Sequence, residues 1–442
     1  MKKLIVASFL LFAIAIQAQE KKWTLRECVD YALDNNISIK QSELDVEQSK
    51  INKKDAIGNF LPSLNASASH SWSIGLSEDP LSGSNINSTN KNLSGGISSS
   101  VTLYDGLQNF NQLYRSNLQI LASKYQLDKM KDDTSLFVAN SFLQILFNKE
   151  QLKVLQAQFE LSKQERERTQ ELVNAGVLPE GDLLEIQATI STQEQQIVNA
   201  ENAVTISKIQ LAQLLLLPNY KNFDIAEVNY TVPPSEVLSE APETIISKAK
   251  ETRNEIKIAE ANAEIADYNL KIARGARQPS LSASYRFGSN YFQSDLFDTD
   301  DFETQLTDNK SHNINLQLNI PIFNGFSIGN NVKRNKVNLE QAKLQLEQAK
   351  LDLESTVYQA YNDAKGALKA YEAAQKTLEA RQLAFNYSKE RYNVGLSNAF
   401  DFNQSRTQFI SAQSDVIRTK YDYIFKLKVL EFYFGIPITD IN

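Results

Sequence analysis

The sequence has few of the residues that most enzymes use for catalysis or metal binding. Its 442 residues include one cysteine, Cys28, and two histidines, His70 and His312. A single cysteine excludes an internal disulfide, and its place in an apolar stripe at helical spacing predicts a buried core position. The sequence contains no HExxH, GxGxxG or phosphate-binding Walker loop. We therefore expect a protein that is not an enzyme and that holds no metal or other cofactor.

Long apolar runs are also scarce. Residues 1–18 have the basic start, apolar centre and small residues of a secretory signal peptide. No later segment has the roughly 18 consecutive apolar residues of a transmembrane helix. We therefore expect an exported protein whose insertion into a lipid bilayer would use β-strands. The formal net charge of −7 argues against a nucleic-acid partner.

Glycine and proline are missing from two very long stretches. Residues 107–175 contain neither, and residues 330–394 contain only Gly366. At about 1.5 Å per residue, each stretch predicts a helix on the order of 100 Å long. Because no single globular core is that long, we expect these helices to pack side by side as coiled coils. In the second stretch, the expected seam alternates spacings of three and four and consists of Leu339, Ala342, Leu346, Ala349, Leu353, Thr356 and Ala360.

The chain is internally duplicated. An offset of 219 residues relates Gly176 to Gly395 and Asp182 to Asp401, and an offset of 217 relates Pro62 to Pro279. A half-length repeat predicts two copies of one structural unit. The expected organisation is a signal peptide (1–18), first-copy N-terminal helices (19–61), a strand hairpin (62–105), a long helical hairpin (106–217), a linker (218–242), a second-copy helix (243–278), a second strand hairpin (279–324), and a second long helical hairpin with the C-terminus (325–442).

Two segments, 62–105 and 279–324, alternate apolar and polar residues. Ile314, Leu316 and Leu318, for example, are separated by asparagine and glutamine, a period of two that indicates strands. A soluble sheet over a core would show the same pattern, but export and the lack of apolar helices favour transmembrane strands with an apolar lipid face and a polar lumen face. Four strands cannot close a barrel and an open edge is not viable in lipid. We therefore expect an oligomer of two, three or four copies.

The connections between these strands are polar. Residues 77–92 predict a loop, and residues 293–310 add six acidic side chains to a second one. The glycine that an EF-hand requires at its sixth position is absent from the acidic segment. We therefore interpret it as a solvated loop and not as a calcium site.

After each of the two long helices, a short interruption precedes the next helix. Gly176 and Gly395 lie within these two interruptions, and glycine suits the left-handed conformation that ends a helix. Asp182 and Asp401 are each followed three residues later by Glu or Gln, the spacing of a capping box. We expect the interruptions to be hairpin tips and both aspartates to be N-caps of the returning helices.

Together these features resemble the TolC-type outer-membrane efflux family. The resemblance rests on the duplication, on a strand hairpin followed by a very long helix, and on the paired tips NAGVLPEGDLLEIQAT and RYNVGLSNAFDFNQSRTQ; the start WTLRECVDYALDNN also looks like the family's first helix. It implies a mixed α/β membrane protein that is a homotrimer, in which three chains share a 12-stranded barrel in the outer membrane. Their coiled-coil helices would continue as a tunnel through the periplasm, with residues 218–242 in an equatorial band.

The resemblance also implies partners and a gate at the tips. The tips would dock on a periplasmic adaptor protein that couples to an inner-membrane pump. Tyr392 matches a gating tyrosine of the family, Asp401 an entrance-ring aspartate, and Asp182 a polar tip residue, so that a Tyr392–Asp182 closing contact is a hypothesis. Ser397 and Gln404 depart from the arginine and second aspartate of a well-studied member, and its full gate therefore does not transfer. The docking residues that it implies are Gly176, Val177, Leu178, Val394, Gly395, Leu396 and Ser397.

The expected function is a passive exit duct in the outer membrane, part of a tripartite efflux or type I secretion system. Two alternatives stay open: a periplasmic coiled-coil scaffold without a pore, and an exported enzyme built around residues 293–310. Drugs, metal ions, peptides and secreted proteins are all compatible cargoes, because in such machines specificity resides largely in the pump.

Overall fold

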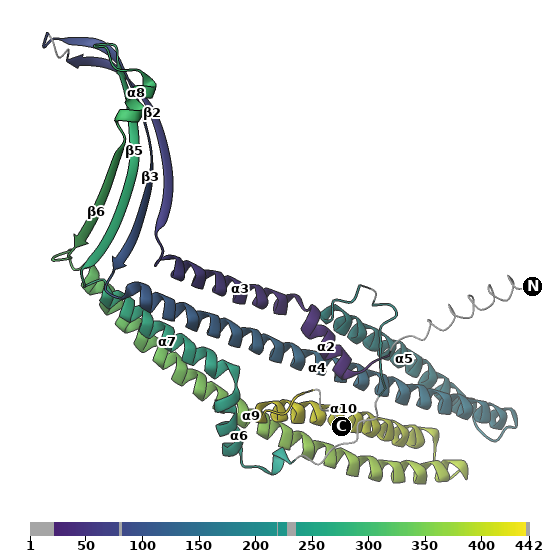
Figure 1. Ribbon diagram of the computed structural model, residues 1–442. Helices are drawn as coiled ribbons and strands as arrows, with labels where there is room; N and C mark the ends of the chain where they lie inside the picture. The colour runs from purple at the N-terminus through teal and green to yellow at the C-terminus, as the bar shows by residue number, and fades with distance from the viewer. Residues whose placement is uncertain (1–21, 79–81, 219, 228–235, 439–442) are drawn as a thin grey trace, which may run out of the picture. The chain divides into compact units, whose positions relative to one another are not determined.

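The computed structural model describes residues 22–78, 82–218, 220–227 and 236–438 (Figure 1). The signal peptide expected at 1–18 lies outside these residues. The chain forms two compact units. Unit 1 is built from Met1–Glu43, Gln126–Ile256 and Gln348–Asn442, and unit 2 from Leu44–Tyr125 and Lys257–Glu347.

Unit 2 contains a four-stranded antiparallel sheet. Its order is β2 (Ser63–Glu78), β3 (Asn85–Tyr104), β5 (Ser280–Ser294) and β6 (Ser311–Asn319), visible side by side in Figure 1. Strands β2 and β6 are the two edges, and among the described residues neither outer edge has a partner strand. The expected loop at 77–92 is wrong for most of its length, because the ladder continues through the pairs Ser77–Ile86 and Glu78–Asn85. Apart from Ile86, that run is polar on both faces, so the sequence shows no alternation there.

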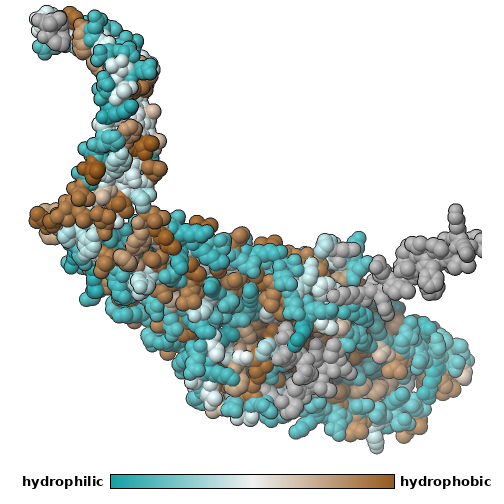
Figure 2. All heavy atoms as spheres, in the orientation of Figure 1, coloured by the Kyte–Doolittle hydropathy of each residue, from teal (hydrophilic) through white to brown (hydrophobic). Residues whose placement is uncertain are grey.

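One face of this sheet is apolar and uncovered. Ile74, Ile314 and Leu316 are 79%, 80% and 67% exposed, although burying such side chains is normally favourable by about 1.5–3 kcal/mol each. Figure 2 shows hydrophobic side chains gathered where β6 leads into α9 (Ser327–Asn393). There Ile322 and Phe323 are also largely exposed. An exposed apolar surface of this extent indicates contact with lipid or with another protein.

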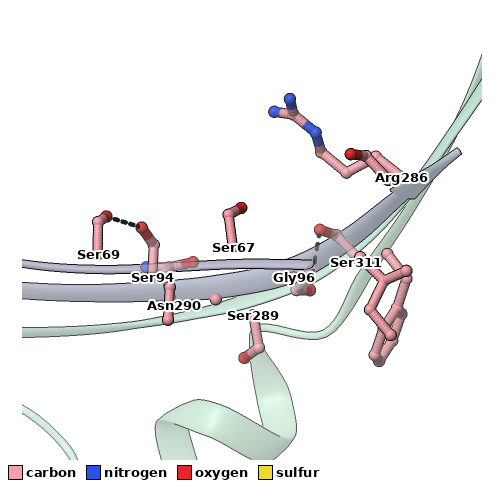
Figure 3. A pocket seen from close by; sticks show the side chains of 14 residues that line it. Ser67, Ser69, Ser94, Gly96, Arg286, Ser289, Asn290 and Ser311 are labelled. Atoms are coloured by element: carbon pink, nitrogen blue, oxygen red, sulfur yellow. Dashed lines mark hydrogen bonds between the residues drawn. The ribbon is translucent and has the colours of Figure 1, made fainter. Parts of the chain in front are cut away.

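The opposite face is polar and has glycines at its centre. Ser67 lies opposite Gly96, Gly96 opposite Gly288, and Gly288 opposite Ser311 (Figure 3). A Cβ on Gly96 would lie 2.5 Å from the carbonyl oxygen of Phe287. Glycine therefore allows the two strands to approach each other at this row.

The acidic segment 293–310 is more than a solvated loop, because it contains helix α8 (Phe302–Asp308). Asp301 caps this helix by accepting from the backbone N–H groups of Glu303 and Thr304. The Gln305 amide then bonds both the N–H and the C=O of Phe292, each at 2.9 Å. Because β6 pairs with β5 only as far as Gly288, α8 satisfies the part of the β5 edge that β6 leaves free. No described residues form a cluster of three His, Cys, Asp or Glu able to hold a metal.

Both copies of the repeat contain the same pair of short helices. They are α2 (Leu25–Asn35) and α3 (Ile37–Gly58) in the first copy, and α6 (Pro242–Thr252) and α7 (Asn254–Gly275) in the second. In the second copy we expected one helix over 243–278, which is wrong. Asn36 and Arg253 have ψ angles of 132° and 134° and end the first helix of each pair. Neither break contains glycine or proline, the usual signals.

The long helices are of equal length. Helices α4 (Gln108–Asn174) and α9 are 67 residues each, and α5 (Glu180–Leu214) and α10 (Ala399–Phe434) run back beside them (Figure 1). The expected seam is partly right: Leu339, Leu353 and Ala360 are buried, but Thr356 is exposed and Val357 is buried in its place. The shift from Thr356 to Val357 has a simple reason: a straight helix drifts relative to a strict seven-residue repeat.

Among the described residues, no helix is both long and apolar enough to cross a membrane.

The core of unit 1 joins both ends of the chain to the middle of α4. Cys28 is fully buried in this core, which also contains Phe142 and Ile145, as expected from its apolar stripe. Short strands β1 (Lys22–Trp23) and β4 (Asp224–Ile225) pair in parallel at its edge. A 3₁₀ turn at Val237–Ser239 precedes α6.

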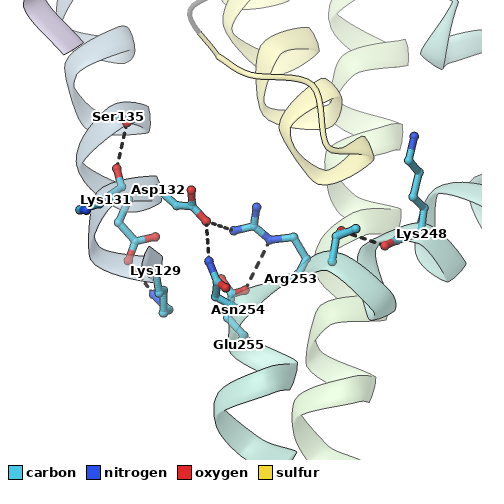
Figure 4. Close-up of polar contacts among 10 residues, drawn as sticks. Lys129, Lys131, Asp132, Ser135, Lys248, Arg253, Asn254 and Glu255 are labelled. Atoms are coloured by element: carbon cyan, nitrogen blue, oxygen red, sulfur yellow. Dashed lines mark hydrogen bonds and ion pairs between the residues drawn. The ribbon is translucent and has the colours of Figure 1, made fainter. Parts of the chain in front are cut away.

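A buried ionic cluster lies at the break between α6 and α7 (Figure 4). The Arg253 side chain is 7% exposed, and its Nη2 lies 3.3 Å from Oδ2 of Asp132 on α4. Its Nε lies 3.4 Å from Glu255, but without hydrogen-bond alignment. The guanidinium stacks 3.9 Å from the centre of the Phe432 ring of α10. Arg253 therefore contacts three helices of unit 1, which are α4, α7 and α10. Its position at the helix break allows its side chain to reach all three.

In unit 2, the start of α4 touches the end of α7 through backbone. Gly106, with φ of +71°, lies against Gly275, the last residue of α7. A Cβ on Gly275 would lie 2.5 Å from the Gly106 carbonyl oxygen. Further along, Arg115 donates from Nη1 to the Asn269 side-chain oxygen at 3.1 Å. Two glycines are therefore required at this crossing.

Candidate functional site

Both hairpin tips in unit 1 end their long helix in the same way. At the first tip, the N–H groups of Gly176 and Val177 donate to the carbonyl oxygens of Val173 and Leu172, at 2.9 Å each. At the second, Gly395 and Leu396 donate to Tyr392 and Arg391 at 3.0 and 2.8 Å. This is the Schellman pattern, and it requires a left-handed residue. Gly176 and Gly395 supply it with φ of +71° and +75°.

The expected N-caps at Asp182 and Asp401 are wrong. Helix α5 begins after Pro179, which makes no side-chain cap, and α10 begins after Asn398. The Asn398 side-chain oxygen accepts from the N–H of Asp401 at 2.8 Å. Both aspartates therefore lie in the first helical turn, where a negative charge still interacts favourably with the helix dipole.

The tips expose apolar side chains. Val177, Val394 and Leu396 are 66%, 67% and 70% exposed, while Leu178 and Ser397 are half-buried. Phe400, which the sequence comparison of the tips did not single out, is equally exposed. Its position beside Asp401 in the first turn of α10 was the available signal. The two tips thus present an apolar surface with few charges, a composition that favours protein contact.

Tyr392 is held inside the second tip by an aromatic stack. Its ring is parallel to that of Phe402, with centroids 4.9 Å apart, and Phe385 and Phe409 continue the stack. The Tyr392 hydroxyl is buried without a hydrogen-bond partner among the described residues. Stacks of this kind are worth about 0.5–1.5 kcal/mol per pair beyond burial. The stack fixes the ring between α9 and α10 and leaves only the hydroxyl unsatisfied.

Burial raises the pKa of Tyr392, and the carboxylates of Asp182 and Glu165 raise it further. The nearby Thr169 hydroxyl opposes that rise, although it makes no hydrogen bond of normal geometry. Tyr392 is therefore a neutral hydrogen-bond donor at neutral pH. Asp182 lies close enough to act on it electrostatically, but no hydrogen bond joins the two side chains within this chain. The proposed Tyr392–Asp182 closing contact stays a prediction.

A buried ion pair that the sequence analysis missed supports the second tip. Arg406 of α10 lies 3.3 Å from Glu165 of α4, with side chains 5% and 21% exposed. Burial raises the pKa of Glu165 despite Arg406, and burial lowers the pKa of Arg406. The signal was an arginine in the buried stripe Phe402, Arg406, Phe409. A second link between the tips is the hydrogen bond from Arg168 to Asn393 at 3.0 Å.

Asp401 lies at an open depression on the second tip. The depression has a volume of about 520 Å³, and its lining includes Leu383, Tyr387 and Ser397. The Asp401 carboxylate is exposed and makes no ion pair among the described residues. It therefore faces solvent directly.

We expect Gly395→Ala to lower the stability of the folded protein by about 1–2 kcal/mol, because alanine is strained in the left-handed region. No atom lies within 4 Å of the position of a Cβ at Gly395, so backbone strain is the only cost. Gly366→Ala is the matched control: it lies in the middle of α9 with equally open space and should stabilise by about 0.5–1 kcal/mol. Thermal unfolding followed by circular dichroism measures both. Equal shifts in the two variants would contradict the left-handed assignment.

Comparison with known proteins agrees with this architecture. The family model described as outer membrane efflux protein matches residues 28–215 and 245–435. The pyoverdine export outer membrane protein OpmQ of Pseudomonas aeruginosa is 25% identical over 398 residues, 88% of this chain and 80% of that protein. Among solved structures, CusC has a TM-score of 0.78 at 17% identity, covering 93% of this chain and 91% of that chain. The CmeC outer membrane channel of Campylobacter jejuni has a TM-score of 0.76 at 20% identity, covering 93% and 85%.

The matched residues include both tips and both long helices, and the relatives are proteins of the outer membrane. The apolar sheet face and the two tips fit that location. The chain therefore belongs to the outer membrane efflux protein family, the family of TolC-like channels, and resides in the outer membrane.

Proposed function

We propose that the protein is the passive exit duct of an efflux or type I secretion system, formed by three chains that share a 12-stranded barrel. The observation that carries this proposal is the four-stranded sheet with an exposed apolar face and two edges that no described strand pairs with. Edges of this kind are not viable in lipid unless other strands pair with them. Three copies supply 12 strands, and pairing of β6 with the next chain's β2 closes the ring.

The hairpin tips would be the periplasmic entrance. Their exposed apolar side chains suit docking of a periplasmic adaptor, which would couple the duct to an inner-membrane pump. The residues involved would be Gly176, Val177, Leu178, Val394, Gly395, Leu396 and Ser397. Asp182, Tyr392 and Asp401 would form the gate. Because the Asp401 carboxylate is exposed, three copies near a common axis would concentrate negative potential and favour cations.

Single-channel conductance in a planar bilayer tests the duct and the entrance together. The purified mature protein should give discrete, cation-preferring steps. Asp401→Asn should lower the ratio of cation to anion permeability by roughly sevenfold, because about one kT of lost potential changes the cation and anion terms by about 2.7-fold each, in opposite directions. Asp45→Asn, which makes the same substitution at an exposed position of α3 in unit 2, is the control and should leave the ratio unchanged.

The same record decides between the duct and the periplasmic scaffold. A well-folded protein that leaves the envelope without detergent and gives no conductance steps would support the scaffold and overturn the duct. Steps with an unchanged selectivity in Asp401→Asn would keep the duct and reject Asp401 as an entrance residue.

A further inference from the structure

The polar face of the sheet has an unusual charge distribution. In the described strands β2, β3, β5 and β6, the side chains on this face are almost all serine, asparagine, glutamine, threonine or glycine. No aspartate or glutamate occurs on it, because Glu78 has the parity of the apolar face. One charged residue remains, Arg286 of β5. It lies between Ser98 of β3 and Asn313 of β6.

The Arg286 guanidinium is available. The side chain is exposed, and among the described residues it makes no ion pair or hydrogen bond. Figure 3 shows it on the same side of the sheet as Ser67 and Ser69. An arginine beside acidic residues would normally be neutralised by them. Here the absence of carboxylates on this face leaves its charge and five N–H donors uncompensated.

Arg286 borders a depression with a glycine floor. The depression has a volume of about 280 Å³. Gly96 and Gly288 lie at its base, so no side chain rises from the centre of the row next to Arg286, which Ser67 and Ser311 flank. Hydroxyl and amide groups surround it: those of Ser67, Ser69, Ser94, Asn290 and Ser311. The Ser69 and Ser94 hydroxyls hydrogen-bond each other at 2.9 Å. The site combines one cation, several neutral donors and open space.

We propose that this depression binds the oxyanion group, carboxylate or phosphate, of small solutes passing through the duct. The proposal rests on the proposed function, since it takes the polar face to be the inner wall of the barrel. The planar fork of arginine matches two oxygens of such a group, and charge-assisted hydrogen bonds are about twice as strong as neutral ones. The serine hydroxyls can donate to a third oxygen. Each subunit would carry one such site, on a wall that is otherwise uncharged.

This site would act in the opposite sense to the entrance. Exposed Asp401 favours cations at the tips, whereas Arg286 would retain anions within the barrel. A solute with both charges would meet an attractive group at each of the two sites.

Inorganic phosphate is the probe. Ionic current through single channels is recorded while phosphate replaces chloride at constant ionic strength. We expect phosphate to reduce the wild-type current in a saturable manner, and Arg286→Gln to weaken its apparent affinity at least about tenfold, the factor for one lost charge-assisted hydrogen bond. Arg277→Gln is the matched control, because Arg277 is also exposed but lies in the turn before β5; it should leave the phosphate effect unchanged.

The outcomes separate the two proposals. If no preparation gives conductance steps, the duct itself is wrong. If all three proteins conduct and respond equally to phosphate, the duct stands and the oxyanion site is overturned. A loss of phosphate sensitivity in Arg286→Gln alone supports the site.

Discussion

Replacing Gly106 by alanine should destabilise the protein more than any other single glycine-to-alanine change at a left-handed position. Its φ of +71° costs an alanine roughly 1–2 kcal/mol. The new Cβ would also overlap the carbonyl oxygen of Gly275 and lie 2.9 Å from the Cβ of Gln278. Backbone cannot rotate away as a side chain can, and overpacking adds roughly 1–3 kcal/mol. We expect a loss of about 3 kcal/mol, measured by thermal unfolding in detergent.

Gly176→Ala separates the two contributions. Gly176 has the same φ of +71°, but nothing lies within 4 Å of its Cβ position. Gly176→Ala should therefore lower the stability only by the part that is due to the left-handed backbone. If both variants melt at the same temperature, the close crossing of the two backbones at Gly106 and Gly275 is contradicted.

The second large effect is expected for Arg253→Met. Methionine fills the volume but leaves the Asp132 and Glu255 carboxylates without their cation. Removing one partner of a buried pair typically costs about 3–5 kcal/mol. Because the Asp132 side chain is 32% exposed, we expect a value near the lower end, about 3 kcal/mol. Lys248→Met is the control: Lys248 also lies over an aromatic ring of α10, 3.8 Å from the centre of Phe434, but it is exposed and should cost under about 1 kcal/mol.

The loss in Arg253→Met should depend on pH. Burial raises the pKa of Asp132 above its ordinary value even with Arg253 present. Without Arg253 it should rise further. A carboxyl with a raised pKa binds more protons in the folded state than in the unfolded state, so stability falls as pH rises through that range. The variant should therefore recover part of its stability between pH 7 and pH 5. A deficit that is constant over this range would show that Asp132 does not stay charged and unpaired in the variant.

The periodic parts of the fold could be predicted because the sequence is regular there. The two 67-residue helices follow from the absence of helix breakers, and the strands follow from alternation wherever one face is apolar. The prediction failed where both faces are mostly polar, as in residues 85–92, which belong to β3 and not to the expected loop. It also failed at Arg253, where no glycine or proline lies at the break; at Asn36, by contrast, the side chain accepts from the N–H of Ser38 and so caps α3 locally. The Arg253 cluster shows what favours the break there: an interaction with Asp132, more than a hundred residues away.

The site was only partly predictable for a similar reason. Glycine at the tips has a local cause, so Gly176 and Gly395 were identified correctly as turn residues. The first residues of the returning helices were not predicted correctly. Asp401 has the spacing of a capping box, but Asn398, three residues earlier, is also a good N-cap residue, and it is Asn398 that caps α10. The Arg406–Glu165 pair joins separate helices, and no spacing within either helix encodes it.

Because the chain is duplicated, it contains two sets of the residues that form the close backbone contact in unit 2. A single chain forms this contact, here called the joint, only once. Gly106 and Gly275 meet within the chain. Their counterparts in the other copy are Gly325 and Gly58, and nothing lies within 4 Å of the Cβ position of either.

The hydrogen bond close to this joint is also formed only once within the chain. Arg115 bonds Asn269, while the equivalent Arg334 and Asn52 are both exposed. In the proposed trimer, these unused halves would belong to neighbouring subunits and meet at each boundary. The ring would then have approximate sixfold symmetry, with joints inside chains alternating with joints between chains. The subunit interface would then repeat, between two chains, the same contact that each chain already forms within itself.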